Sequence, residues 1–309
     1  MFSKFKKLLK KSNFILTCVD NFRIIFWSLL FMISPILLAK YKYSTKMKKK
    51  LDLKNPKLFD EKLLWLMLNW KHPLKTRCAD KYAMRSFVEE CGLVKHLPIL
   101  YGVYNNAKEI DFDILPASFV LKCTRGCGFN IICFDKKKLD KPDAVKKLNK
   151  WLKTDISKRV GEVHYASIEP KIICEEYIGD SFDKTPDDYK LYCFNGSAFC
   201  TMVCSGRFME ENTKFDFYDR EWKNKLPFSR SSLLADRSVP KPKNFTLMID
   251  IADKLSKPFP FVRVDLYSTK NKVYIGELTF TPNGCIDPGL TPEAQVTMGR
   301  LIQLPKKYL

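Results

Sequence analysis

Polar and apolar residues alternate most regularly near the C-terminal end, where residues 261–281 read FVRVDLYSTKNKVYIGELTFT. Side chains alternate between the two faces of a strand, so we predict two antiparallel strands joined by a turn at 269–272, with Ser268 opposite Lys272. The apolar face of this hairpin then consists of Val262, Val264, Leu266, Tyr274, Leu278 and Phe280. The polar face consists of Arg263, Asp265, Glu277, Thr279 and Thr281.

The polar face places two carboxylates, Asp265 and Glu277, almost opposite each other beside Arg263. Hard oxygen ligands a few ångströms apart suit Mg²⁺ when the ion also carries substrate phosphates. Antiparallel sheets also commonly expose one polar face to solvent. The alternation alone therefore leaves both a magnesium site and a solvated sheet face open.

The remaining periodicities predict helices and strand pairs, with no repeat or low-complexity linker after residue 50. Helical patterns cover 59–70, 79–91, 142–153 and 242–256, and Thr291-Pro292 predicts the start of a final helix. Strand patterns cover 118–123, 130–134, 171–177, 188–195 and 197–204. The last two meet at Asn195-Gly196, a strong hairpin signal. Because helices and strand pairs come in separate runs, we predict an α+β fold in one compact unit.

The first 50 residues have a composition of their own. Five lysines precede an uncharged run from Ile24 to Ala39, and six more follow it. The run is shorter than the ~20 residues that a transmembrane helix needs, and no small-residue cleavage site follows it. We predict a basic amphipathic helical segment that lies on an anionic membrane surface, at the inner face of the plasma membrane. The alternative is that part of the segment packs on the body as a buried helix.

The net charge of +20 does not by itself indicate a nucleic-acid partner. Residues 1–50 contribute +11, so the other 259 residues carry only +9. A moderately basic body suits a phosphate-bearing or carboxylate-bearing substrate at least as well, and we expect no specific nucleic-acid binding. The eleven cysteines lack the usual spacings of a zinc site. Most of them lie in strand-like apolar runs, among them Cys174, Cys193 and Cys200, and are predicted to be small buried side chains in a reducing cytoplasm.

A possible phosphate site follows the strand predicted at 118–123. Lys122 lies near the end of this strand and leads into a loop that contains Gly126 and Gly128. An ammonium supplies charge, and glycines let backbone N–H groups approach phosphate oxygens. The spacing is not that of a P-loop, and a Gly-x-Gly turn between strands is often only a turn.

Two further strands end in or carry charged residues. The strand at 171–177 ends in Glu175 and Glu176, which either hydrogen-bond an adenine amine or ribose hydroxyl or simply reach solvent. Lys190 shares a strand face with Asp188, so it is either a second phosphate ligand or half of a salt bridge.

The order of these motifs resembles the TupA-like branch of the ATP-grasp superfamily from about Asn55 to Glu293. The matching stretches are NPKLFDEKLLWL, DKYAMRSFV, FVLKCTRGCGFNIIC, IICEEYIGD, DYKLYCFNG and FPFVRVDLY followed by VYIGELTFTP. The resemblance implies two α+β lobes that clamp ATP with Mg²⁺, phosphorylate a carboxylate and let an amine displace the phosphate to form an amide. It also implies a role in bacterial cell-surface polysaccharides such as teichuronopeptide and capsule, with a sugar-acid acceptor and an amine donor as substrates. The parts expected are an N-terminal segment at 1–50 and an ATP-grasp domain at 51–309, divided into 51–117, an ATP-covering lobe at 118–178, and a metal- and substrate-binding lobe at 179–309.

The resemblance also implies roles for individual residues. The expected phosphate ligands are Lys122 and Lys190, with Arg125, Gly126, Gly128 and Asn130 in the covering loop. Glu175 and Glu176 are expected beside the adenine and ribose. The expected magnesium ligands are Asp265, Glu277 and Thr279, and Arg263 is expected to act with Lys190 on the phosphate being transferred.

The covering loop departs from the family pattern Asn-His-Gly-Ser-Gly-Asp-Asn, since residues 124–130 read TRGCGFN. Arg125 can still meet a phosphate, but Phe129 cannot hydrogen-bond. Thr279 stands where wider ATP-grasp enzymes often have Asn, although this branch tolerates Thr there. A catalytically inactive relative that serves as a binding or assembly module is therefore one alternative. A glycosyltransferase of polysaccharide biosynthesis is another.

Overall fold

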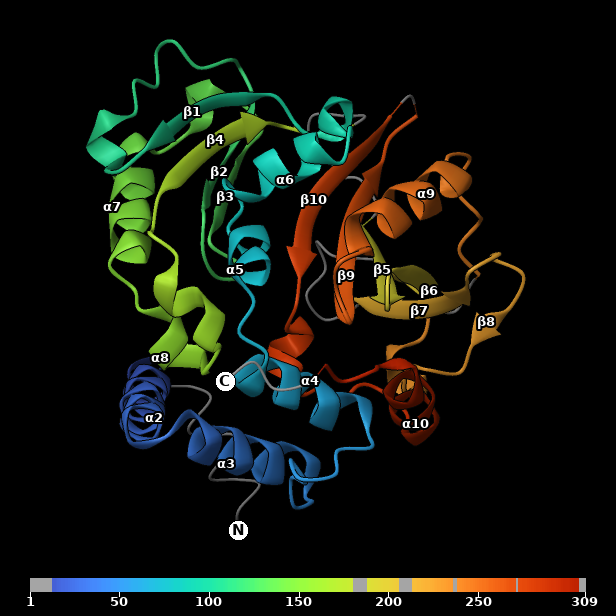
Figure 1. The fold of residues 1–309 in the computed structure, drawn as a ribbon. Coiled ribbons are helices and arrows are strands. Elements are labelled where there is room, and N and C mark those ends of the chain that lie inside the picture. The colour runs from blue at the N-terminus through green and yellow to red at the C-terminus, as the bar shows by residue number, and fades with distance from the viewer. Residues whose placement is uncertain (1–12, 180–187, 206–212, 236–237, 271, 306–309) are drawn as a thin grey trace.

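The computed structural model describes residues 13–179, 188–205, 213–235, 238–270 and 272–305, which form two antiparallel sheets (Figure 1). The smaller sheet has the order β1 (Leu100–Tyr104), β4 (Ile172–Glu176), β2 (Phe119–Cys123), β3 (Asn130–Cys133). The larger sheet has the order β10 (Val273–Thr279), β9 (Phe261–Ser268), β5 (Asp188–Phe194), β6 (Ser197–Ser205), β7 (Lys214–Asp219), β8 (Lys225–Leu226). In Figure 1, β10 is the strand of the larger sheet nearest to the smaller sheet.

Helices cover these sheets. The α-helices are α2 (Asn13–Ile33), α3 (Pro35–Met47), α4 (Phe59–Asn69), α5 (Pro73–Ala79), α6 (Met84–Glu90), α7 (Lys141–Leu152), α8 (Ile156–Val160), α9 (Phe245–Ser256) and α10 (Pro292–Leu301). The 3₁₀ turns are η1 (Val94–His96), η2 (Ala107–Glu109), η3 (Lys136–Lys138), η4 (Val163–Ser167), η6 (Ser231–Leu233) and η7 (Pro282–Cys285).

The smaller sheet packs on α7. This helix begins after Asp140, whose carboxylate accepts a hydrogen bond from the backbone N–H of Asp143 at 2.9 Å, and its inward face buries Leu148. Leu148 packs with buried strand residues such as Phe119 and Leu121 in a core separate from that of the larger sheet. The smaller sheet is therefore a unit with its own apolar interior.

One face of the larger sheet changes from apolar to charged along its strands. At one end, Phe59 of α4 packs its ring against Tyr192 and Phe261. Two residues back along β5, and on the same face, lies Lys190, which is paired in register with Asp265 of β9. On the opposite face Leu191 and Val264 are buried, and β5, β6 and β9 pack on α9. Lys190 and Asp265 thus lie beyond the part of this face on which Phe59 of α4 packs.

The predicted hairpin forms, but its register differs from the prediction. Ser268 pairs with Val273 rather than with Lys272, and a bulge at Gly276 shifts the pairing between Ile275 and Glu277. Val273 and Ile275 consequently face the core, and the prediction that Tyr274 lies on the core face is wrong, since it lies on the charged face. The extra residue is what returns Glu277 to the face of Asp265.

Most other predicted elements are confirmed. Asn195 and Gly196, both with positive φ, connect β5 and β6 as the hairpin signal predicts. The helix predicted at 79–91 is wrong in its first part, because Asp80 accepts hydrogen bonds from the N–H groups of Tyr82 and Ala83 and α6 starts only at Met84. Cysteines predicted to be small buried side chains, such as Cys174, are buried.

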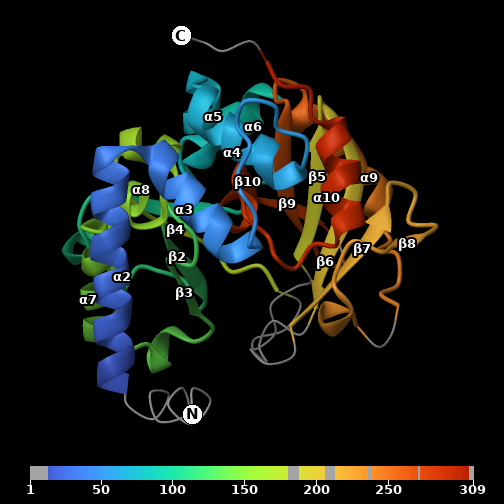
Figure 2. The same ribbon diagram turned by 90° about the horizontal axis from the view of Figure 1, so that it is seen from below.

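The N-terminal segment forms two helices, and residues 1–12 lie outside the described part of the chain. α3 buries Leu38, Ala39, Lys42 and Tyr43, so the alternative of packing on the body is confirmed for this helix. Figure 2 shows α2 along one edge of the molecule, next to α8 and α3. Of the helices described here, none is sufficiently long and apolar to cross a membrane.

Candidate functional site

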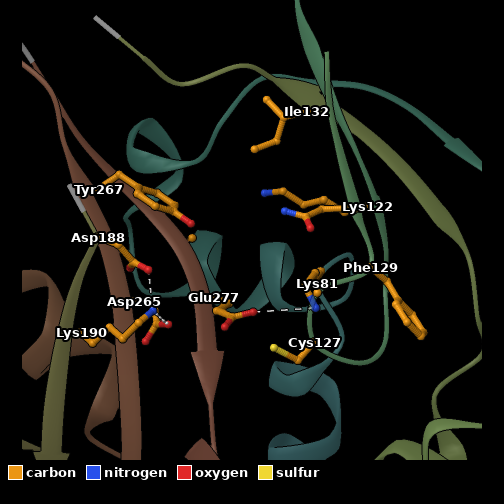
Figure 3. A pocket seen from close by; sticks show the side chains of 13 residues that line it. Lys81, Lys122, Cys127, Phe129, Ile132, Asp188, Lys190, Asp265, Tyr267 and Glu277 are labelled. Carbon is orange, nitrogen blue, oxygen red and sulfur yellow. Dashed lines mark hydrogen bonds and ion pairs between the residues drawn. The ribbon is translucent and has the colours of Figure 1, made fainter. Parts of the chain in front are cut away.

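A cavity of about 340 Å³ lies between the smaller sheet and the charged end of the larger sheet (Figure 3). Its lining residues are Lys81, Lys122, Cys127, Gly128, Phe129, Asn130, Ile132, Asp188, Lys190, Asp265, Tyr267, Gly276 and Glu277. They come from β2, β3, β5, β9, β10 and two connecting segments. The site thus needs both sheets, and it unites most of the predicted motifs.

Three charged residues form a row across adjacent strands of the larger sheet. Lys190 of β5 is the register partner of Asp265 on β9, which is in turn the partner of Glu277 on β10. The ammonium of Lys190 lies 2.7 Å from one oxygen of Asp265 and 2.6 Å from Asp188, so the predicted salt bridge with Asp188 forms. Figure 3 shows the side chains of this row pointing into the cavity.

Arg263 holds the Asp265 carboxylate from the other side. Its Nε lies 2.6 Å from Oδ1 and its Nη2 lies 2.7 Å from Oδ2, a two-point contact that fixes the carboxylate orientation. Nη2 also donates to the Thr279 hydroxyl at 3.2 Å, and that hydroxyl donates to Glu277 at 3.2 Å. The side chains of Arg263, Asp265, Glu277 and Thr279 are therefore one connected network.

The electrostatics keep Glu277 ionised. Burial alone raises the pKa of a carboxyl, but the charges of Lys81, Lys190 and Arg263 outweigh burial and lower the pKa of Glu277 to about 2. Lys81 lies 3.8 Å from the Glu277 carboxylate and donates to the backbone carbonyl of Gly126 at 2.7 Å. Lys81 thus connects the larger sheet to the loop that follows β2.

The facing wall carries Lys122. Its ammonium lies 2.8 Å from Glu175, and the other oxygen of Glu175 lies 2.8 Å from Arg85 of α6. Glu176 is on the opposite face of β4, where it accepts a hydrogen bond from the N–H of Ile99 at 3.1 Å. Neither glutamate is among the residues that line the cavity.

The loop at 124–130 crosses one end of the cavity. Gly126 and Gly128 both have positive φ, and a side chain at Gly126 meets Ile156 at 3.0 Å, so this backbone requires glycine. Phe129 stacks on Trp151 of α7 with ring centroids 5.2 Å apart, and its ring anchors the loop where the family pattern has a polar residue. Asn130 and Gly128 line the cavity.

Arg125 does not take the place predicted for it. Its guanidinium donates to the backbone carbonyls of Ile168 at 3.3 Å and Thr154 at 3.1 Å, and Arg125 is not among the residues that line the cavity. The two carbonyls accept N–H groups of Arg125 that would have to be available if Arg125 bound a phosphate. We therefore omit Arg125 from the candidate phosphate ligands.

The donor set fits Mg²⁺ with phosphates better than a metal held by protein alone. In the described part of the chain, no group of three or more His, Cys, Asp and Glu side chains could hold a metal ion. Asp265 and Glu277 supply two carboxylates, which suffices for Mg²⁺ when phosphate oxygens and water complete its shell. The surrounding lysines and Arg263 match the negative charge of a nucleoside triphosphate.

Two cations of the site were not assigned a role from the sequence. Lys81 and Arg85 both lie in the stretch DKYAMRSFV, which carries part of the family resemblance. That stretch has no pattern that points to phosphate chemistry, and Lys81 lies between α5 and α6 whereas Arg85 lies in α6. Only the packing of this segment between the sheets reveals them.

Comparison with known proteins identifies the family of this chain. The model of the family described as TupA-like ATPgrasp matches residues 61–303. No curated protein matches the sequence. Solved structures similar to this chain include a D-alanine–D-alanine ligase from Bacillus anthracis complexed with ATP (14% identity, TM-score 0.47, 73% of this chain and 64% of that chain). Another is a D-alanine–D-alanine ligase from Helicobacter pylori (14% identity, TM-score 0.39, 74% of this chain and 61% of that chain). A third is a phosphoribosylamine–glycine ligase from Thermotoga maritima (13% identity, TM-score 0.38, 66% of this chain and 48% of that chain).

The chain spans less than two thirds of the length of each of these three ligases. The family match, in contrast, extends over both sheets and every residue of the candidate site. The chain therefore belongs to the TupA-like ATP-grasp family, with its α+β ATP-grasp fold.

Proposed function

We propose that this protein is an ATP- and Mg²⁺-dependent ligase that joins a carboxylate to an amine through an acyl phosphate. The observation that carries the proposal is the facing of Lys122 on one sheet and the Lys190–Asp265–Glu277 row on the other across one cavity. Phosphorylation of a carboxylate brings an anion to a polyanionic nucleotide, so the site must neutralise repulsion. This cavity concentrates the cations and carboxylates that the step needs.

The residues take the following roles. Asp265, Glu277 and Thr279 hold the metal, which when bound neutralises phosphate charge and aligns the oxygens for transfer. Lys122 and Lys190 contact phosphates, and Gly126, Gly128 and Asn130 form the cover that excludes water from a readily hydrolysed product. The family resemblance assigns Glu175 and Glu176 to the adenine and ribose. Arg263 orients Asp265 and faces the phosphoryl group in transit.

The reaction has two steps and needs no reactant besides ATP, the carboxylate and the amine. A carboxylate oxygen of the acceptor attacks the γ-phosphorus and ADP leaves. The amine nitrogen then attacks the acyl carbon, inorganic phosphate leaves and the nitrogen loses a proton. Asp188 and Asp265 occupy two of the three N–H donors of the Lys190 ammonium, and the third donates to a phosphate oxygen.

The family resemblance supports a sugar acid of a surface polysaccharide precursor, such as that of capsule or teichuronopeptide, as the acceptor, with an amino compound as the amine donor. The part at 118–178 covers ATP and the part at 179–309 holds metal and substrate. Exposed apolar residues on α2, among them Phe22 and Ile25, support attachment at the cytoplasmic face of the membrane.

A glycosyltransferase has less support. The sequence contains one Asp-x-Asp, Asp111-Phe-Asp113, a spacing that such enzymes use for a metal. The Asp111 carboxylate accepts a hydrogen bond from the N–H of Asp113 at 2.9 Å, and Asp113 pairs with Lys141 at 2.8 Å. Both aspartates lie outside the cavity described above.

The test is ADP release from MgATP over a panel of sugar acids and amines. Wild type is expected to turn over with at least one pair, Lys122→Ala is expected to lose turnover, and Lys254→Ala, an exposed lysine on α9, serves as the matched control. Equal turnover in Lys122→Ala and wild type contradicts the proposal. Binding of MgATP without ADP release from any pair favours the inactive relative.

A further inference from the structure

A second cavity, of about 600 Å³, lies beneath the junction of α2 and α3. Ser34, Pro35 and Ile36 of the junction line one side, and the end of α4, the start of α5 and the turn η4 line the rest. It shares no lining residue with the nucleotide cavity. Its size is in the range of pockets that hold small molecules.

The polar part of this cavity is basic. Lys71, His72, Lys75 and His164 line it, and none of its described lining residues is acidic. The buried ammonium of Lys75 donates to the backbone carbonyls of Leu66, at 3.2 Å, and Trp70 at the end of α4. Two of its three N–H donors are thus used, and burial lowers the pKa of Lys75 to about 8, so the group is still mostly charged at neutral pH.

His164 adds a group that needs a partner. Its side chain is buried, and within the described structure neither ring nitrogen has a hydrogen-bond partner. A neutral imidazole always has one N–H, and a buried N–H without a partner is costly. His164 is one of the residues that line the cavity, so its unpartnered ring nitrogens belong to the wall that a ligand meets. The polar wall is therefore suited to an anion.

The outer rim of the cavity is apolar and continues along α2. Of the sixteen large apolar residues found exposed in the described structure, nine fall between Val19 and Tyr41. Phe22, Ile25, Leu29 and Met32 follow one another at spacings of three and four, so they share one helical face. Ile33, the last residue of α2, is 71% exposed, and Ile36, which lines the cavity, is 43% exposed.

We propose that this cavity binds the phosphate-bearing headgroup of an anionic membrane lipid while the exposed face of α2 rests among the acyl chains. The inference rests on the membrane attachment proposed above and specifies what the attached protein recognises. An anionic headgroup matches Lys71, Lys75 and the unpartnered His164, and acyl chains match the apolar rim. Phosphate alone leaves the rim exposed, and an uncharged lipid leaves the basic wall unmatched.

The test uses the full chain and short-chain lipids below their micelle concentration. The ε-methyl group of Met67, which lines the cavity, is followed by NMR during titration with dihexanoyl phosphatidylglycerol, dihexanoyl phosphatidylcholine and inorganic phosphate. We expect phosphatidylglycerol to cause a saturable change in the Met67 chemical shift at a far lower concentration than phosphatidylcholine or inorganic phosphate. Lys71→Gln and His164→Phe are each expected to bind about fivefold more weakly, in keeping with the loss of ~1 kcal/mol, and Lys254→Gln is expected to bind as wild type does.

Three outcomes overturn the proposal. Equal shifts with inorganic phosphate assign the cavity to a free anion, and equal shifts with phosphatidylcholine show that charge is not recognised. Binding of phosphatidylglycerol vesicles without any shift at Met67 leaves the membrane attachment standing and removes the headgroup site. Asp265→Asn separates this proposal from the ligase proposal, because we expect it to lose MgATP binding and to keep the Met67 shift.

Discussion

Asp265 and Glu277 are direct partners across β9 and β10 because a bulge at Gly276 inserts one residue before Glu277. A Cβ atom at Gly276 meets the Tyr267 ring at 2.7 Å and the Asp265 carbonyl oxygen at 3.1 Å. Without the bulge, Glu277 shares the face of the core residues Val273 and Ile275. The pairing of the two carboxylates therefore depends on this glycine.

Gly276→Ala is expected to displace the bulge, to weaken MgATP binding and to lower the free energy of unfolding by about 1–3 kcal/mol, the usual cost of overpacking. Calorimetric titration and urea unfolding measure the two effects. In a Tyr267→Ala background the ring contact is absent, so Gly276→Ala is expected to lower the free energy of unfolding by less. Unaltered affinity and stability in Gly276→Ala count against the bulge as the device that pairs the carboxylates.

Glu175 is expected to matter more for stability than its neighbour Glu176. Glu175→Ala leaves Lys122 and Arg85 without their shared carboxylate in a mostly buried setting, which typically costs about 3–5 kcal/mol. Glu176→Ala removes a hydrogen bond to the exposed Ile99 and is expected to cost about 1 kcal/mol. Urea unfolding of both variants tests the difference. Equal losses contradict the placement of Glu175 between two cations.

The stack of Phe129 on Trp151 is expected to hold the loop over the cavity. Phe129→Ala removes a ring contact worth about 0.5–1.5 kcal/mol beyond its buried area, so we expect weaker ATP binding and faster proteolysis within 124–130. Phe134→Ala removes a different ring contact, with Tyr177, and is the matched control. A loop that is equally protected in both variants argues against this role.

His164 is expected to make folding sensitive to acid. Burial lowers its pKa to about 3, against about 6.5 for an unfolded histidine, so the unfolded state binds the proton first. The contribution of the neutral His164 to the free energy of unfolding is fully present above pH 6.5. It is lost as the pH falls toward 3, at up to ~1.4 kcal/mol per pH unit. The stability of His164→Phe relative to wild type, followed by urea unfolding, is therefore expected to rise as the pH falls from 7 to 4. A pH-independent difference refutes this assignment.

The parts of the fold that follow local rules could be predicted from the sequence. Asn195-Gly196 makes its hairpin because both residues accept positive φ, and Thr291 caps α10 by accepting the N–H of Ala294. The charged row was also predictable in outline, since strand alternation sets Lys190 and Asp265 on pocket-facing positions. Turn signals, helix caps and strand alternation each depend on residues close together in the chain.

The features that escaped prediction depend on distant contacts. The bulge at Gly276 has no local signal beyond a glycine inside a strand. The position of Arg125 depends on carbonyl groups at Thr154 and Ile168, which only the folded chain brings near. Lys81 joins the site because the segment after α5 lies beside the covering loop. In each case tertiary packing decides where a side chain points.

The central claim is that Asp265 and Glu277 hold the metal of a nucleotide site. Calorimetric titration of the full chain with ATP, with and without Mg²⁺, tests it most directly, beside Asp265→Asn and the control Asp253→Asn, whose aspartate pairs with Arg220 on the surface. The account predicts magnesium-dependent binding in wild type and in the control, and its loss in Asp265→Asn. Absence of binding in the folded wild type, or equal binding in Asp265→Asn, contradicts it.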